Sequence, residues 1–361
     1  MPTTILELPD NLINLIFTFA QTKDKKLKLS ELIKFDTIYF ELLPLNYYIL
    51  EIDINIKLIN DKKKILKKIF SNFCNIIIKT HNINTSLCQN IYFYSTNLIH
   101  LTFGDKFNQP LKYSLNKFKN LTHLTLNKNF NQPLKKSLNK LIKLTYLKFG
   151  FNFNKSLNNS LNELKFLKCL IFGSKFNQHL NNSLDNLKNL THLTFGYDFN
   201  QSLDNSLNNL VNLTHLTFGK MFNQNLNRSL NNLQNLTHLT LGYNFNQSLG
   251  HSCNLKNLTH LIFGKMFNQS LDSLNNLVNL THLTLGHNFN QLLDNSLNNL
   301  VNLTHLTLGH NFNQSLDNSL NNPTLLRYFI LVLQMFVVNL YNLYLKVFYK
   351  NLLLVIKLIK P

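Results

Sequence analysis

The dipeptide Phe-Asn occupies ten positions along this chain that are spaced 22 or 23 residues apart. A period this short and regular predicts a repeat array rather than one globular domain. Each coil of such an array contacts only its neighbours, so the product is an extended surface without a deep pocket. The repeat therefore favours a protein that binds other macromolecules. The phenylalanines are Phe107, Phe130, Phe153, Phe176, Phe199, Phe222, Phe245, Phe267, Phe289 and Phe312.

A single coil, residues 213–235, shows the apolar order L-x-x-L-x-F-G-x-x-F-N. This order is close to a leucine-rich-repeat consensus. The alternation from Leu216 to Phe218 predicts a short strand with these two side chains in the core and His215 and Thr217 facing away. Gly219 is expected to let the chain bend sharply at the strand end. The predicted fold is a leucine-rich-repeat-like solenoid with one short parallel β-strand per coil.

The Phe-Asn pairs predict a structural ladder inside the array. Each Phe is expected to re-enter the core, and the Asn amide has two donors and an acceptor for backbone groups of a buried turn. The variable return, from Ser229 to Leu233, has apolar residues three apart, which suits a brief helical or 3₁₀ turn. Representative ladder pairs are Phe107 and Asn108, Phe130 and Asn131, Phe199 and Asn200, Phe222 and Asn223, Phe245 and Asn246, and Phe289 and Asn290.

The repeated unit F-N-Q-x-L…S-L-x-x-L-x-x-L-T-H-L-T-F-G resembles the FNIP repeat family, which is leucine-rich-repeat-like and occurs in amoebae and their giant viruses. The resemblance covers residues 98–322 with ten units. The family's usual Phe-Asn-Ile-Pro is here Phe-Asn-Gln followed by Pro or Ser, as in residues 107–110. The resemblance implies a protein-interaction array and names no ligand.

Residues 1–50 are predicted to form a small α-helical segment. Leu8-Pro9 suits a helix start, and Leu12, Ile16 and Phe19 then fall on one stripe. The layout resembles an F-box, although Glu41 departs from that pattern. The resemblance implies that a Skp1-type adaptor of a ubiquitin ligase would bind the F-box-like residues. The alternative is an amphipathic cap on the first coil. The adaptor-binding residues would be Leu8, Pro9, Leu12, Ile16 and Phe17.

Two further segments flank the ten repeats. Residues 51–97 are interpreted as a linker or as irregular first coils. Residues 323–361 form a hydrophobic tail whose stretch 328–348 is almost wholly apolar and long enough to span a bilayer. Three interpretations of the tail stay open: a cap on the last coil, which is favoured, a membrane anchor, or a change of reading frame at the end of the gene.

The net charge of +19 is uneven along the chain. Residues 98–188 carry 15 Lys and 3 acidic residues, whereas residues 189–322 carry 4 basic and 5 acidic residues. A nucleic-acid binder is expected to keep its charge along the whole groove, so nucleic acid is a less favoured partner than a protein target. The four cysteines lack paired spacing and predict reduced thiols in a cytoplasmic or nuclear protein, of a host cell if the gene is viral.

Two columns of polar residues, one of histidine and one of threonine, mark the predicted binding face. A metal ladder or pH switch on the histidines is the less favoured reading, because no carboxylate regularly accompanies them. No Ser-His-Asp set, paired carboxylates or phosphate-binding glycine loop occurs, so neither catalytic residues, metal nor cofactor is expected. Cys169 and Tyr146 replace His in two coils. The candidate face comprises His123, Thr125, His192, Thr194, His215, Thr217, His238, Thr240, His282, Thr284, His305 and Thr307.

Overall fold

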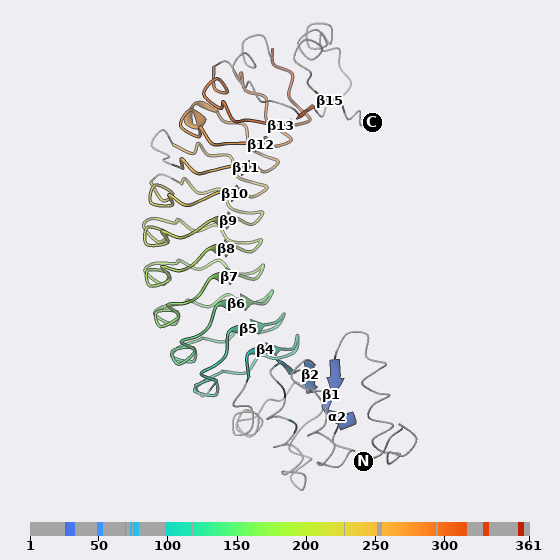
Figure 1. Ribbon diagram of the computed structural model, residues 1–361, viewed down its shortest axis with the longest axis vertical. Helices are drawn as coiled ribbons and strands as arrows, with labels where there is room; N and C mark the ends of the chain where they lie inside the picture. Colours follow the sequence, from blue (N-terminus) through green and yellow to red (C-terminus); the bar gives the residue numbers. More distant parts are fainter. Residues whose placement is uncertain are drawn as a thin grey trace, which may run out of the picture. The chain divides into compact units, whose positions relative to one another are not determined.

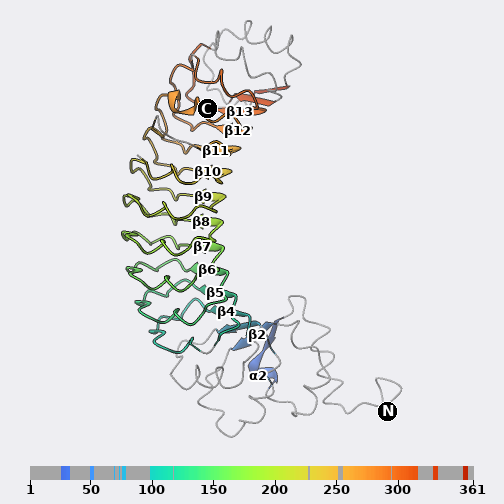
Figure 2. The same ribbon diagram turned by 60° about the vertical axis from the view of Figure 1, so that its left-hand side comes forward.

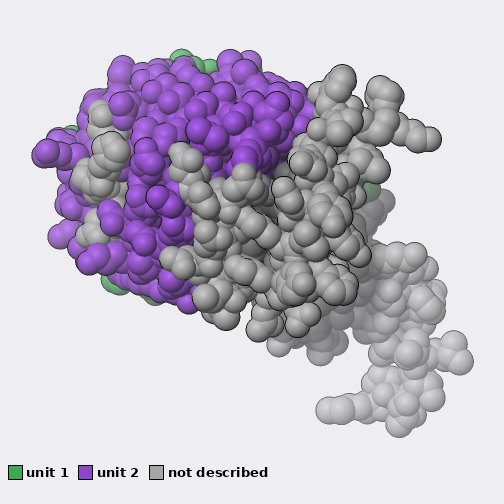
Figure 3. All heavy atoms as spheres, turned by 90° about the horizontal axis from the view of Figure 1, so that it is seen from above, with its two compact units in different colours: residues 1–167 green, residues 168–361 purple. Residues whose placement is uncertain are grey.

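The computed structural model describes residues 98–315 apart from 117, 227, 251–254 and 294. Outside this range it describes residues 26–32, 49–52, 69, 73, 75–78, 328–331 and 353–356. The chain divides into unit 1, residues 1–167, and unit 2, residues 168–361, which Figure 3 distinguishes by colour. Each unit is a parallel sheet whose strands follow sequence order, one per coil (Figure 1).

Among its described residues, unit 1 contains six of these strands and one short helix. Its strands pair in register, so that His100 lies opposite His123 and Leu101 opposite Leu124. The return segments leave and rejoin the sheet between successive strands (Figure 2). The elements are β1 Lys26–Lys28, α2 Leu29–Leu32, β2 Ile49–Ile52, β3 Asn75–Ile78, β4 His100–Phe103, β5 His123–Leu126 and β6 Tyr146–Phe149.

Unit 2 contains nine strands and a single-turn 3₁₀ helix among its described residues. From β8 to β13, the histidines of neighbouring strands lie opposite each other, as with His215 and His238. The elements are β7 Cys169–Ile171, β8 His192–Thr194, β9 His215–Thr217, β10 His238–Thr240, β11 His260–Ile262, η5 Asp272–Leu274, β12 His282–Thr284, β13 His305–Leu308, β14 Tyr328–Leu331 and β15 Leu353–Ile356.

The core of each coil consists of leucine and phenylalanine side chains. Leu216, Phe218 and Phe222 expose at most 3% of their surface, as the period-two strand pattern predicts. The ring centroids of Phe218 and Phe222 lie 4.0 Å apart, and Phe222 stacks on Phe199 and Phe245 at 6.0 and 6.1 Å. A continuous column of aromatic rings therefore runs through the interior of unit 2.

The asparagine after each phenylalanine connects successive coils. Asn223 Oδ1 accepts a hydrogen bond from the backbone N–H of Asn246 at 2.8 Å and another from Gln247 Nε2 at 3.2 Å. Asn108 and Asn131 do the same for the next coil's backbone in unit 1. The structure thus places the predicted ladder pairs in the core and at the coil-to-coil junction.

The glycine that follows most strands, such as Gly219, is needed for a different reason from the one predicted. Gly219 does not adopt the left-handed backbone region; instead, a Cβ there would lie 1.8 Å from the carbonyl oxygen of Gly196. Gly242 has the same relation to Gly219, also at 1.8 Å. Glycine is therefore required by the close approach of neighbouring coils and not by the freedom to bend.

The return segments consist of turns closed by i to i+3 hydrogen bonds, as from Leu233 N–H to Leu230 C=O at 3.0 Å. Only Asp272–Leu274 forms a 3₁₀ helix among the described residues. Strand β3 lies in the segment predicted as a linker or as irregular first coils and pairs with β2, which begins just before that segment. Residues 26–28, in the segment predicted to be helical, form a strand.

Candidate binding surface

The strand face of unit 2 carries six histidines in one row. We call this set the histidine column: His192, His215, His238, His260, His282 and His305. Neighbouring ring centroids are 4.0 to 4.3 Å apart, with interplanar angles of 9° to 12°. The rings are half-buried rather than freely exposed, except for that of His192, because each one covers its neighbour. The column is therefore a stiff, continuous surface.

A threonine precedes each histidine of the column and fixes the tautomer of its neutral ring. Thr214 Oγ1 donates its single proton to the carbonyl oxygen of Thr191 at 3.0 Å and lies 2.9 Å from His215 Nδ1. Since the hydroxyl proton is already used, Nδ1 must carry the hydrogen and donate it to Oγ1. The same pair of contacts recurs from Thr191 to Thr304. Each neutral imidazole therefore keeps Nε2 as a hydrogen-bond acceptor.

The four inner histidines of the column have lowered pKa values. Burial lowers the pKa of His215, His238, His260 and His282, and charge repulsion from other histidines of the column lowers the pKa further. In unit 1, burial likewise lowers the pKa of His123, whose ring lies 5.4 Å from that of Tyr146. The middle of the column, from His215 to His282, therefore favours the neutral imidazole.

The second predicted column lies beside the histidines on the same face. Thr217 and Thr240 are half-buried at the ends of strands β9 and β10 and lie opposite each other. Thr194, Thr284 and the other threonines at this position continue the row, with Ile262 replacing Thr in β11. The structure therefore brings the unit 2 members of the predicted face together on one side of the sheet. His123 and Thr125 lie in β5 of unit 1.

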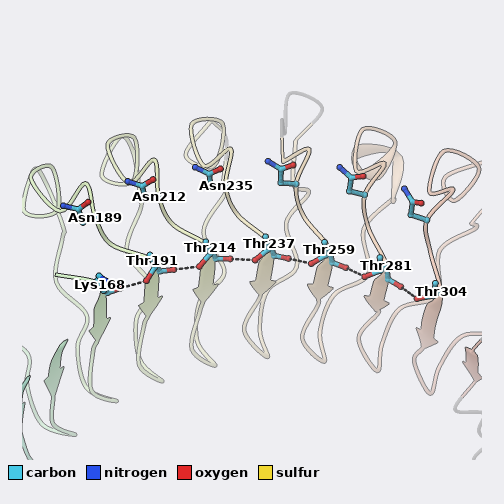
Figure 4. A pocket seen from close by; sticks show the side chains of 13 residues that line it. Lys168, Asn189, Thr191, Asn212, Thr214, Asn235, Thr237, Thr259, Thr281 and Thr304 are labelled. Carbon is cyan, nitrogen blue, oxygen red and sulfur yellow. Dashed lines mark hydrogen bonds between the residues drawn. The ribbon is translucent and has the colours of Figure 1, made fainter. Parts of the chain in front are cut away.

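A groove at the start of the strands was missed by sequence reasoning. It has a volume of about 1070 Å³ and is lined by Lys168 and by an Asn and a Thr from successive coils (Figure 4). Asn212 Nδ2 donates to the carbonyl of Lys188 at 2.9 Å, and Asn235 Nδ2 donates to that of Val211 at 2.9 Å. The sequence feature that could have indicated this groove is the Asn-Leu-Thr triplet, which recurs in successive coils and also matches a glycosylation site.

The remaining predicted sites place limits on the chemistry. Within the residues that the structure describes, no three His, Cys, Asp or Glu side chains are grouped so that they could hold a metal ion. Burial raises the pKa of the Cys169 thiol, which makes it a poor nucleophile at neutral pH. The F-box-like residues 8–17 lie outside the described residues, as does most of the tail. No described helix is both long and apolar enough to cross a membrane.

Comparison with known proteins shows the fold. No protein-family model matches the chain, and no curated protein matches it. The giant-virus protein CroV588, a circular leucine-rich-repeat structure, is 27% identical over 87% of this chain, with a TM-score of 0.56. The chain has a leucine-rich-repeat fold. It spans 52% of the length of CroV588.

Two bacterial structures show the same fold at lower identity. The leucine-rich-repeat protein LIC12759 of Leptospira interrogans is 17% identical, with a TM-score of 0.56 over 86% of this chain and 82% of its own. Internalin InlF of Listeria monocytogenes is 20% identical, with a TM-score of 0.52 over 74% of this chain and 82% of its own. At these identities the likeness concerns architecture alone.

Proposed function

We propose that the protein is a non-enzymatic scaffold that holds a protein target on the strand face of unit 2. The observation that carries the proposal is the histidine column, whose rings stack at 4.0 to 4.3 Å with their Nδ1 atoms tied to threonines. A surface whose side chains are already ordered loses little conformational entropy when a partner binds. Leucine-rich-repeat solenoids provide extended surfaces of this kind for binding.

The chemistry of the face favours a protein over a polyanion. Residues 189–322 carry 4 basic and 5 acidic residues, so no positive groove follows this part of the array. The Nε2 acceptors and threonine hydroxyls suit the peptide N–H groups and polar side chains of a protein surface. The basic coils 98–188 supply the alternative, nucleic acid, for which affinity would fall steeply with salt.

Proximity labelling in the cell that expresses the protein tests the scaffold proposal. The strand-face variant is His215→Glu with His238→Glu, which places charge among the stacked rings. The matched control is Asn209→Glu with Asn232→Glu, because both residues are exposed on return segments. We expect certain proteins to be labelled by the wild type and by the control variant but not by the strand-face variant. Equal profiles for the two variants would contradict binding on the strand face.

We further propose that residues 8–17 bind a Skp1-type adaptor, so that the array presents its target to a ubiquitin ligase in the cytoplasm or nucleus. The support is the Leu-Pro-x-x-Leu start of this segment and its resemblance to an F-box. A pull-down with a Skp1-type adaptor checks it, using the double variant Leu12→Asp, Ile16→Asp. Binding by the wild type alone supports the proposal, whereas equal binding or none removes it.

A further inference from the structure

The residues that follow each strand-ending glycine of unit 2 break the uniformity of the repeat. Here the sequence alternates between Tyr with an Asp or Asn, and Lys with a Met, over four successive coils. The histidine column is constant over the same coils, so this position distinguishes one coil from the next. We call the set the tyrosine–lysine rim: Tyr197, Asp198, Lys220, Met221, Tyr243, Asn244, Lys265 and Met266.

The lysines of the rim lie against tyrosine rings, Lys220 between two of them and Lys265 beside one. Lys220 Nζ lies 5.2 Å from the ring centroid of Tyr197 and 4.7 Å from that of Tyr243. Lys265 Nζ lies 5.6 Å from the ring centroid of Tyr243. These distances are within the range of cation–π attraction. A hydrogen bond with Tyr197 raises the pKa of Lys220, so its ammonium group stays charged.

The apolar side chains of the rim are exposed and anchored. Tyr197, Met221, Tyr243 and Met266 expose 46%, 41%, 38% and 41% of their surface. Met221 Sδ accepts a hydrogen bond from Asn244 Nδ2 at 3.4 Å, and the backbone N–H of Met221 donates to Tyr197 C=O at 2.9 Å. Tyrosine and methionine are enriched at protein interfaces. The rim thus combines exposed apolar surface with two preorganised cations.

Little negative charge opposes an acidic ligand at this place. Within residues 197–266 the sequence has only two acidic residues, Asp198 and Asp204. The Asp198 carboxylate lies 3.6 Å from Lys175 Nζ, which offsets its charge. Asp204 lies on a return segment, with a φ of 41°. The rim is therefore a locally basic and aromatic strip within residues 189–322, which are otherwise nearly neutral.

We propose that the tyrosine–lysine rim binds an acidic, proline-containing segment of a partner protein in the polyproline II conformation. Lys220 and Lys265 are two coils apart, which is roughly 9.6 Å at the spacing of neighbouring strands. Polyproline II has three residues per turn and rises about 3.1 Å per residue, so carboxylates at i and i+3 share one face about 9.3 Å apart. The prolines between them contact the tyrosine rings, as in other aromatic grooves that bind this conformation.

This inference rests on the proposed scaffold function and specifies the chemistry of its partner. The probe is the labelled peptide Gly-Pro-Glu-Pro-Pro-Glu-Pro-Pro-Gly, titrated with the full-length chain in fluorescence anisotropy at low ionic strength. The rim variant is Lys220→Gln with Lys265→Gln. The control is Lys188→Gln with Lys256→Gln, which removes the same charge from residues whose carbonyls accept from the groove asparagines.

We expect the rim variant to raise the Kd of the peptide about tenfold, the product of roughly threefold per exposed ion pair. The control variant should leave the Kd unchanged, and a peptide with adjacent glutamates should bind the wild type more weakly. Tyr243→Leu should also weaken binding without altering the melting curve. Equal Kd values for rim and control variants, equal binding of a peptide with Lys in place of Glu, or no binding, would overturn the inference.

The two proposals fail in distinguishable ways. Loss of labelled targets with the strand-face variant, together with peptide binding that ignores the rim variant, would keep the scaffold function and remove the rim. If the rim variant weakens peptide binding but the strand-face variant changes no labelled protein, the rim proposal stands and the strand face is not the target surface.

Discussion

Replacing Asn223 by alanine tests how the coils are joined. Asn223 Oδ1 is the acceptor for two donors of the following coil, the backbone N–H of Asn246 at 2.8 Å and Gln247 Nε2 at 3.2 Å. Alanine removes this acceptor while leaving both donors in place. The substitution therefore isolates one junction in the middle of unit 2.

The structure sets the size of the expected loss. The bond from Gln247 is worth about 1 kcal/mol, and a buried N–H without an acceptor costs about 1 to 3 kcal/mol. Since Asn246 is only half-buried, the lower part of that range applies, and we expect Asn223→Ala to lower the free energy of unfolding by about 2 kcal/mol. Asn223→Asp keeps an acceptor oxygen and should cost clearly less.

Asn235→Ala is the matched control, because it removes an asparagine that acts as a donor. Asn235 Nδ2 donates to the carbonyl of Val211, which is exposed and can accept from water instead. We expect a loss of about 1 kcal/mol or less for this variant. Urea unfolding followed by circular dichroism gives the midpoints, with the slopes compared as a check on cooperativity. Equal losses for Asn223→Ala and Asn235→Ala, or for Asn223→Ala and Asn223→Asp, would refute the acceptor argument.

Three other perturbations follow from the geometry. Gly242→Ala would place a Cβ 1.8 Å from the carbonyl oxygen of Gly219, so it should separate the coils and split urea unfolding into two transitions; a single unshifted transition would contradict the close-approach argument. Phe222→Ala should cost about 3 to 5 kcal/mol in the same assay, since it leaves a cavity in the aromatic column. The lowered histidine pKa values mean that the unfolded state binds more protons below its ordinary pKa of 6.5. The contribution of these histidines to the free energy of unfolding should therefore be fully present above that pH and fall as the pH drops below it. Replacing the histidine column by Gln should flatten this dependence in melts recorded at several pH values.

The period of the sequence was sufficient to predict the coils, the strands and their inward residues. Leu216 and Phe218 alternate with polar residues, and a short apolar alternation next to a fixed Phe leaves one arrangement that buries both. The role of Gly219 could not be predicted, because the contact that requires glycine is made with Gly196 of the preceding coil. A single coil's sequence does not encode the distance between coils.

The candidate surface was predictable only in part. A period-two pattern places His215 and Thr217 on the outer face, and this is where they lie. The groove at the start of the strands arises because Asn212 and Thr214 both donate to carbonyls of the preceding coil. The triplet that holds these two residues does not by itself predict a groove, since hydrogen bonds between coils have no counterpart in one repeat.

The register of the strands has a consequence for how such an array changes in length. His260 lies opposite His282 although only 22 residues separate them, and Asn268 still accepts from the N–H of Asn290 at 2.8 Å. The return segment absorbs the missing residue, while the strand and the Phe-Asn turn keep their partners. Gain or loss of a whole coil would thus preserve every junction. Gene duplication can therefore lengthen the binding face while each coil keeps the same contacts with its neighbours.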